Sequence, residues 1–411
     1  MKGPVAFLFP TLLVSLFGPK LVCSELISAI RQEDTSGNSV VTVRAIVVGD
    51  YQNGDDDELR NLGGFFLQEE KQDEDGNATT SEGIFVYEGR ADTRADVELG
   101  NTVEVTGRLT LFKGTYQIMA DDIAVVDDSA CTGKGSEVDE CLSRLVNFAV
   151  VPSLAGADLN HVEGMIVVFP ENMMISNQFQ LERFNEVDLF VGHTLPYQFT
   201  QLSSPSQIES EKYANDIKAR TIKYDDGLSS SNVGVKLDGF GTDYNEENAL
   251  RVGDSIRYLR GNLQLASGSF RVRSYRDNLN SFDAASNPYP REYEPPLVHG
   301  NLKIASVNVL NFFKTLDRGN IKTKTGQDPR GADSADEFNR QLFKLVNAIV
   351  AMDADIVGIL EMENEFDNVQ DKSTAIEVLV DALNGELNNI LSITSWAKPL
   401  FETNAQLGFF C

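Results

Sequence analysis

Two polar side chains end apolar runs in the C-terminal part of the chain. Asn308 follows the run 302–307, and Glu361 follows the run 355–360. An amide oxygen and a carboxylate are the hard oxygen ligands that Mg²⁺ prefers, and bound Mg²⁺ stabilises the charge that develops on a phosphoryl group during diester hydrolysis. The two residue types therefore suit metal-assisted phosphodiester chemistry, although a strand-terminal Asn or Glu is more often a cap or turn residue.

The segment between these two residues predicts how they are brought together. Both apolar runs have the character of buried strands, and Ser334 and Glu337 have the spacing of a capping box that begins a helix. The residues expected on its apolar face are Phe338, Leu342, Leu345, Ile349 and Met352. A strand–helix–strand unit makes the two strands parallel. Asn308 and Glu361 should therefore lie at the same carboxyl-terminal edge of a sheet, where α/β proteins build their sites.

Four segments around these residues resemble the opening of a known catalytic domain. They are the runs 306–313 (Ser-Val-Asn-Val-Leu-Asn-Phe-Phe), 330–334 (Arg-Gly-Ala-Asp-Ser), 337–341 (Glu-Phe-Asn-Arg-Gln) and 353–364. In this order they are similar to ExeM/NucH-type extracellular nucleases of the endonuclease/exonuclease/phosphatase superfamily. The resemblance covers residues 301–411. The modules before it are similar, less specifically, to the OB-like regions that precede this domain in such nucleases.

The resemblance implies a site and a reaction. Glu361 would be the main metal carboxylate, and Asn308 would help to hold the metal or the scissile phosphate, which makes these two the catalytic residues. The implied cofactor is Mg²⁺ or Mn²⁺, and the implied substrate is DNA, with RNA as an alternative. Residues in family-like motifs, for which a turn or cap role is equally open, are Asn311, Arg330, Asp333 and Asn364. Of these, the candidate contacts to the substrate or its phosphate are Asn311, Arg330 and Asn364.

The chain departs from this family in one respect. The family's domains run further, and their later strands supply a histidine pair and aspartates that activate water and protonate the leaving group, whereas no histidine follows His299 here. We therefore expect residues 300–411 to form an incomplete catalytic domain and the 411-residue chain to lack nuclease activity. Alternatives within the superfamily are a phosphomonoesterase and a phospholipid phosphodiesterase. An alternative from another class is a non-catalytic secreted protein that binds through its β modules.

An internal repeat precedes this segment and sets the expected fold class. Residues 97–103 are echoed by 250–256, and each copy alternates apolar and polar residues around a glycine, as antiparallel hairpins do. The pattern predicts two small all-β, OB-like modules at 25–130 and 148–285, followed by the N-terminal part of an α/β domain in a multidomain chain. OB-type barrels bind oligonucleotides or oligosaccharides on a strand face, but a spacer or packing role is equally open.

Two connecting segments and one disulfide are expected. Residues 131–147 are predicted to form a linker in which Cys131 and Cys141 pair across a short polar loop, as an oxidising compartment permits. Metal binding is the weaker alternative, because the chain has three histidines and no Cys-x-x-Cys. Residues 286–299 are proline-rich and predict a semi-rigid linker.

The N-terminus has the pattern of a signal peptide. Lys2 precedes an apolar run at 5–17, and small residues follow up to Ser24. Residues 1–24 are therefore expected to direct secretion, with the periplasm or the cell surface as other destinations and an uncleaved anchor or a buried segment as the alternative reading. The apolar run is short for a membrane span, and no stable membrane partner is expected. The oligomeric state is left open.

Net charge excludes a protein that coats nucleic acid through general basicity. The chain carries 35 basic and 62 acidic residues, a net charge of −27, whereas non-specific binding to nucleic acid comes mainly from neutralising phosphates. Residues 25–130 alone have a net charge of −15, from 8 basic and 23 acidic residues. Two acidic loops, 55–58 and 73–77, make Ca²⁺ a further candidate ligand, although solvated loop tips are the commoner outcome.

Overall fold

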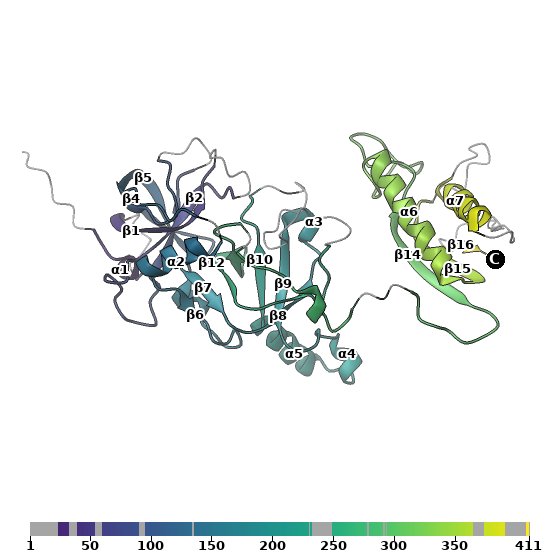
Figure 1. The fold of residues 1–411 in the computed structure, drawn as a ribbon, viewed down its shortest axis with the longest axis horizontal. Coiled ribbons are helices and arrows are strands. Elements are labelled where there is room, and N and C mark those ends of the chain that lie inside the picture. Colours follow the sequence, from purple (N-terminus) through teal and green to yellow (C-terminus); the bar gives the residue numbers. More distant parts are fainter. Residues whose placement is uncertain are drawn as a thin grey trace, which may run out of the picture. The chain divides into compact units, whose positions relative to one another are not determined.

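The chain folds into two compact units, Met1–Pro290 and Arg291–Cys411. Strands dominate the fold and helices are few (Figure 1). The division falls inside the proline-rich segment 286–299. The computed structural model describes residues 24–32, 39–53, 60–89, 95–133, 135–229, 231, 249–277, 279–290, 292, 294–364, 374–390 and 408–410. Most of the expected signal peptide (1–23) and the acidic loop 55–58 lie outside these residues.

The first part of the N-terminal unit is a closed five-stranded barrel. Its strands are β1 (Val40–Tyr51), β2 (Gly64–Gln68), β3 (Gly83–Tyr87), β4 (Thr102–Phe112) and β5 (Thr115–Asp127). They follow the order β1-β2-β3-β5-β4, with β3 parallel to β5. The short helix α1 (Ile27–Ile30) buries Ile27 and Ile30 in the barrel core. This is the all-β module that the sequence predicted at 25–130.

The second part is an eight-stranded sheet in the order β11-β8-β9-β10-β13-β12-β7-β6. Its strands are β6 (Ala149–Val150), β7 (Ile166–Phe169), β8 (Met173–Asn177), β9 (Glu186–Val191), β10 (Thr221–Asp225), β11 (Ser255–Ile256), β12 (Leu259–Ala266) and β13 (Ser269–Arg273). The helical segments are η2 (Leu159–Val162), α3 (Leu181–Phe184), α4 (Phe199–Leu202), α5 (Gln207–Ala219) and η3 (Ala284–Ser286). This sheet is the all-β module expected at 148–285.

The two β modules share their connectivity. The first strand of the barrel, β1, pairs with both β4 and β2. In the second module β7 pairs with β12 and β8 pairs with β9, so β7 and β8 together take the place of β1. Pro170, which lacks an N–H donor, lies at the break between them. The parallel pair β3–β5 likewise corresponds to β10–β13.

The sequence repeat forms the same turn in both modules. Gly100 and Gly253 have φ angles of 91° and 99°, a left-handed conformation that glycine adopts without strain. In the residue after each glycine, a side-chain oxygen accepts a hydrogen bond from the backbone N–H three residues earlier. The acceptors are Asn101 Oδ1 and Asp254 Oδ2, at 2.8 Å in each case. The two copies are therefore equivalent in structure as well as in sequence.

Residues 131–147, which the sequence predicted to be a linker, contain helix α2 (Ser136–Leu145). Val138 and Leu142 lie one turn apart and are buried, which holds the helix against both β modules. The predicted Cys131–Cys141 disulfide is present at the start of this segment. An apolar pattern at helical spacing thus outweighed the Gly-rich start of the segment.

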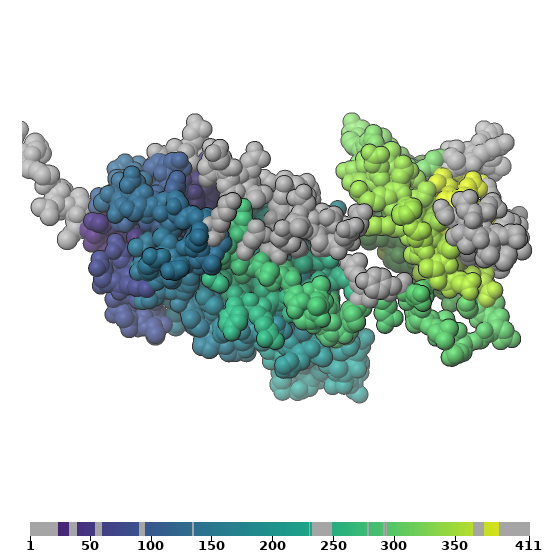
Figure 2. All heavy atoms as spheres, in the orientation of Figure 1, coloured from purple at the N-terminus to yellow at the C-terminus, as the bar shows by residue number. Residues whose placement is uncertain are grey.

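The two β modules and α2 form one unit rather than two separate domains. They share a buried cluster that contains Ile46, Val48, Tyr51, Phe66, Phe85, Cys131, Val138, Leu142, Val146, Ile166, Tyr275 and Leu279. The Tyr51 hydroxyl donates to Asn262 Oδ1 at 3.1 Å, and Arg31 pairs with Glu163 at 2.9 Å across the same interface. In Figure 2 the blue atoms of the first module adjoin the teal and green atoms of the second without a gap.

The C-terminal unit begins with a strand–helix–strand arrangement. Its elements are β14 (Ile304–Phe312), α6 (Ala335–Met352), β15 (Ile356–Met362), α7 (Ala375–Ile390) and β16 (Gly408–Phe410). As predicted, β14 and β15 are parallel, and α6 runs along them (Figure 1). β16 pairs antiparallel with β15.

Helix α6 begins and packs as the sequence predicts. Ser334 Oγ accepts the N–H of Glu337 at 3.2 Å, which caps the helix. On its apolar face Ile349 is buried, and Phe338, Leu342 and Leu345 are half-buried against the same core, which also holds residues of α7. Met352 is half-buried at the end of the helix. The other face of β14 is open, with Ile304 69% and Leu310 75% exposed.

The described part of the chain contains no helix that is long and apolar enough to cross a membrane.

Candidate functional site

A bulge at the end of β14 shapes the candidate site. Asn308 pairs with Leu360 and Phe312 pairs with Met362, so residues 309–311 of β14 lie opposite the single residue Glu361. Such an insertion disrupts the hydrogen-bond ladder and redirects side chains. We refer to residues 309–311 as the β14 bulge.

The backbone around the β14 bulge is strained. Leu310, Asn311 and Glu361 have φ angles of 51°, 55° and 64°. Non-glycine residues rarely adopt this region, and such strain persists only where the surrounding structure imposes it, often at functional sites. Strain on both strands at the same point marks this sheet edge as a candidate site.

All five residues singled out from the sequence as site residues line one cavity at this edge. Its volume is about 530 Å³, and we call it the strand-end cavity. It is lined by Asn308, Asn311, Phe313, Gln327, Arg330, Ile359, Leu360, Glu361, Met362, Asn364 and Ile376. The lining contains one carboxylate, one guanidinium and four side-chain amides. Because these groups come from β14, β15 and the loop before α6, only the fold brings them together.

Most of the polar groups in the strand-end cavity have no partner within the described residues. No described residue forms an ion pair or a hydrogen bond with the side chain of Glu361, Arg330 or Asn364. All three side chains are exposed. Asn308 is the exception, because its Oδ1 accepts the Leu310 N–H at 2.9 Å. Asn308 is therefore also a turn residue, with one lone pair of its carbonyl oxygen still available.

Asp333, which shares a motif with Arg330, does not line the cavity. Its backbone N–H donates to Glu337 Oε2 at 3.2 Å, and its carbonyl oxygen accepts from Arg318 Nε at 2.7 Å. Its contacts therefore support the cap reading, at the start of α6.

Two residues that the sequence did not single out hold the strand-end cavity in shape. The Gln341 side chain donates from Nε2 to the carbonyl oxygens of Val309 and Leu310, at 3.0 Å each. Glu363 is buried and its Oε2 accepts the Thr315 N–H at 2.9 Å. Both lie in segments that resemble the nuclease family, but the contacts of Gln341 depend on the β14 bulge, which a sequence pattern does not reveal.

The donor set of the strand-end cavity fits a hard divalent cation that keeps most of its water. Glu361 supplies one carboxylate, and the asparagines supply amide oxygens, which are the ligands that Mg²⁺ accepts alongside water and substrate phosphate. Among the described residues no group of three or more His, Cys, Asp or Glu side chains could hold a metal ion. Within the acidic loop 73–77, the carboxylate of Asp75 instead accepts hydrogen bonds from Asn77 N and Thr80 Oγ1.

A larger cavity, of about 660 Å³, lies within the N-terminal unit, but both of its arginines are already paired. Arg60 forms an ion pair with Asp277 at 3.2 Å. Arg276 Nε and Nη2 donate to Asp139 at 2.9 and 2.6 Å. The strand-end cavity is therefore the stronger candidate site despite its smaller volume.

The strand face that OB-type barrels use for ligands is covered in the first module. In such barrels the face of strands 2 and 3 carries the ligand, and here the outward side chains Phe66 and Phe85 are 1% and 4% exposed. Gln68, on the same face, donates to Asn147 O at 2.6 Å and accepts the Ile166 N–H at 3.0 Å. These contacts support the packing role that the sequence left open.

The matching face of the second module carries a neutralised charge network. Arg271 Nη1 contacts Glu186 at 2.9 Å and Asp225 at 2.6 Å, and Arg273 also pairs with Asp225. Lys223 bridges Glu186 and Asp188. These pairs leave no excess of positive charge for a phosphate backbone.

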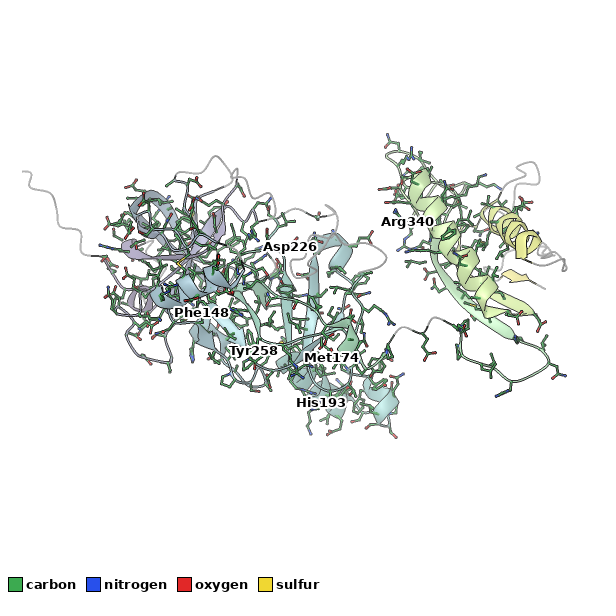
Figure 3. The ribbon with its side chains drawn as sticks, viewed as in Figure 1. Phe148, Met174, His193, Asp226, Tyr258 and Arg340 are labelled. Carbon is green, nitrogen blue, oxygen red and sulfur yellow. A yellow bond between two sulfur atoms is a disulfide. The ribbon has the colours of Figure 1, made fainter. Side chains whose placement is uncertain are left out.

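Asp226 is a further carboxyl group next to this network. It follows β10 (Figure 3) and is buried. Burial, together with the neighbouring Asp225 carboxylate, raises the pKa of Asp226 to about 7. Near neutral pH Asp226 is therefore partly protonated and adds little negative charge to the network on β9, β10 and β13.

Comparisons with known proteins define no family for this chain. No protein-family model matches it, and no curated protein matches it. Among solved structures it is similar to fission yeast Pot1 with single-stranded DNA, with 10% identity, coverage of 60% of this chain and 83% of that chain, and a TM-score of 0.24. A similarity at that score carries no argument about fold or ligand. The strand-end cavity therefore has to be interpreted from its own residues.

Proposed function

We propose that the C-terminal unit carries the metal- and phosphate-binding part of a secreted, Mg²⁺-dependent nuclease site that acts on phosphodiester bonds of DNA, with RNA as an alternative substrate. The observation that carries this proposal is the convergence of Asn308, Asn311, Arg330, Glu361 and Asn364 on one cavity. The resemblance of the same segments to extracellular nucleases supports it.

Each group has a chemical role in this proposal. Glu361 would hold Mg²⁺ or Mn²⁺ together with the amide oxygen of Asn308, and the metal would supply charge stabilisation on a phosphoryl oxygen. Arg330 would bind a phosphate of the substrate through the bidentate geometry of its guanidinium. Asn311 and Asn364 would donate hydrogen bonds to the remaining phosphate oxygens.

None of the described residues that line this cavity is available to activate water. Among its described lining residues there is no histidine and no carboxylate other than Glu361. A general base must lie within hydrogen-bond reach of the proton that it takes, and Glu361 is already assigned to the metal. We therefore expect this chain to bind metal and nucleic acid here without turning over the substrate.

The lining of the strand-end cavity does not separate the alternatives within the superfamily. A phosphomonoesterase or a phospholipid phosphodiesterase of the same superfamily would use the same metal and phosphate groups. A non-catalytic protein that binds through its β modules is less well supported, because the face of the first module is covered and that of the second is neutralised.

The direct test is the binding of Mn²⁺ to the whole chain, measured by electron paramagnetic resonance. Wild type should bind one ion that Glu361→Gln fails to bind, because the carboxylate is the only charged ligand in the described lining. Asp336→Asn, which removes an exposed carboxylate from the first turn of α6, is the matched control and should bind as wild type does. Equal binding by wild type and Glu361→Gln would refute the proposed site.

Turnover needs a separate assay. Incubated with DNA and Mg²⁺, wild type should cleave no faster than Glu361→Ala. Metal-dependent cleavage well above that of Glu361→Ala would show that the chain is a complete enzyme.

A further inference from the structure

The β14 bulge is held by one side chain from another element. Gln341 lies on α6 and its amide nitrogen donates to the carbonyl oxygens of Val309 and Leu310, at 3.0 Å each. A glutamine amide has two N–H donors, so each carbonyl can receive one of them. In a regular strand, backbone N–H groups of a neighbour would satisfy such carbonyls, and the Gln341 amide takes their place.

The bulge in turn orients the amides of the strand-end cavity. Leu310 and Asn311 both have left-handed backbones, and the Leu310 N–H donates to Asn308 Oδ1 at 2.9 Å. The orientation of the Asn308 amide therefore depends on the position of Leu310. The Gln341 contact to the Leu310 carbonyl fixes that position from the helix side.

We propose that Gln341 is a positioning residue for the metal and phosphate ligands of the strand-end cavity. It acts through the β14 bulge: it holds residues 309–311 so that Asn308 and Asn311 face the cavity opposite Glu361. The inference rests on the proposed function, because it assigns Gln341 to the same site. Residues that orient ligands in this way typically contribute ten- to a hundredfold to metal affinity.

A merely structural role would have a different signature. If Gln341 only joined α6 to β14, its removal would lower the stability of the C-terminal unit without changing how the folded protein binds metal. The two roles are therefore separated by comparing affinity with stability in the same set of variants.

The test measures the Mn²⁺ dissociation constant and the urea midpoint of unfolding for the full chain and three variants. Gln341→Met keeps the length of the side chain and removes both donors, and it should weaken Mn²⁺ binding about tenfold. Asn347→Met makes the same change at an exposed amide of α6 and should bind within about twofold of wild type. Val346→Ala truncates a buried residue of α6, so it should lower the midpoint and leave the affinity unchanged.

The outcomes distinguish the inference from the proposed function. Failure of wild type to bind Mn²⁺ would remove the proposed function itself. A second outcome is that wild type binds Mn²⁺, Glu361→Gln does not, and Gln341→Met binds as tightly as wild type. This outcome would overturn the role of Gln341 alone. Equal weakening by Gln341→Met and Val346→Ala would also overturn it, because affinity would then follow stability.

A second measurement requires no substitution and covers the case in which Gln341→Met does not fold. In wild type, Mg²⁺ titration should shift the side-chain amide resonances of Gln341 with the same midpoint as the backbone amide of Glu361. An unchanged Gln341 amide at saturating Mg²⁺ would overturn the inference.

Discussion

The two units of this chain use polar side chains in opposite ways. In the N-terminal unit, charged groups such as Arg271 and Asp225 are buried and paired with each other. In the C-terminal unit, Glu361 and Arg330 share one cavity, and neither has a partner among the described residues. Buried groups need partners because desolvation is costly, so pairing in the first unit indicates a structural role.

The difference shows where a ligand can bind. The polar groups of the strand-end cavity are exposed and lie next to a strained backbone. Packing does not explain why they converge there, so they are candidates for ligand contact. By this criterion the strand-end cavity is the candidate binding site, and the paired charges of the two β modules have a structural role. Substitutions in the N-terminal unit should therefore change stability, and substitutions in the strand-end cavity should change ligand binding.

The largest expected effect concerns the buried, paired charges of the N-terminal unit. Asp139 on α2 is buried and accepts hydrogen bonds from Arg276, from Arg260 Nη1 at 2.9 Å and from the Tyr275 hydroxyl at 2.8 Å. Removing it leaves two guanidiniums and a hydroxyl without their acceptor. Asp139→Ala should therefore cost about 3–5 kcal/mol of unfolding free energy of the N-terminal unit, measured by urea denaturation.

The neighbouring Glu140 provides the control. Among the described residues it pairs with Arg144, and both side chains are exposed; such pairs contribute less than about 1 kcal/mol. Glu140→Ala should therefore leave the midpoint nearly unchanged. Equal effects of the two substitutions would show that the Asp139 contacts are not structural.

A second, smaller effect is expected on the pH dependence of the N-terminal unit. Glu69 and Glu82 lie opposite each other where β2 and β3 begin to separate, and both are buried. Burial raises the pKa of Glu69 to about 8, and the nearby Glu82 carboxylate adds to the shift. Burial likewise raises the pKa of Glu82 to about 7.

The sign follows from proton linkage. Between pH 4.5 and pH 8 these two groups bind protons in the folded state that they release in the unfolded state, so the stability that they contribute is greatest below pH 4.5 and falls as pH rises towards 8. A loss of roughly 1–3 kcal/mol is expected over this window, measured by hydrogen exchange in β2 and β3. Glu69→Gln should reduce the slope, whereas the exposed control Glu182→Gln should not. A wild-type slope that rises with pH would contradict the account.

Several local features of the C-terminal unit could be predicted from the sequence alone. The Ser334 cap, the apolar face of α6 and the parallel strands were predictable because they depend on local periodicity and on the geometry of a strand–helix–strand unit. The same geometry placed Asn308 and Glu361 at one edge of the sheet. The roles implied by the family resemblance stay predictions.

Other features depend on tertiary contacts that leave no local signal. Phe66 and Phe85 alternate with core residues as any strand residues do, and only packing against α2 and the second module shows that their face is covered. Gln341 could not be assigned a role, because the β14 bulge that it contacts is visible only in the structure. Helix α2 lies in a segment that was expected to be a linker, because residues 132–140 have the composition of a short polar loop.

The smallest expected effect concerns the charge of the strand-end cavity. Arg330→Met should weaken binding of a short single-stranded DNA in Mg²⁺ by roughly 1–2 kcal/mol, because a charge-assisted hydrogen bond to phosphate is lost. The matched control is Arg340→Met: Arg340 (Figure 3) is an exposed arginine of α6 that does not line the cavity. Fluorescence anisotropy measures both affinities. Equal losses would mean that only net charge matters.

The central claim is that ligand binding belongs to the strand-end cavity and not to the β modules. It is tested most directly by paramagnetic broadening in the ¹⁵N-labelled chain at substoichiometric Mn²⁺. The account predicts selective loss of the backbone amide signals of Asn308, Asn311 and Glu361, with the signals of β2, β3, β9 and β10 retained. Broadening centred on the β modules or on the acidic loop 73–77, with the Glu361 signal intact, would contradict it.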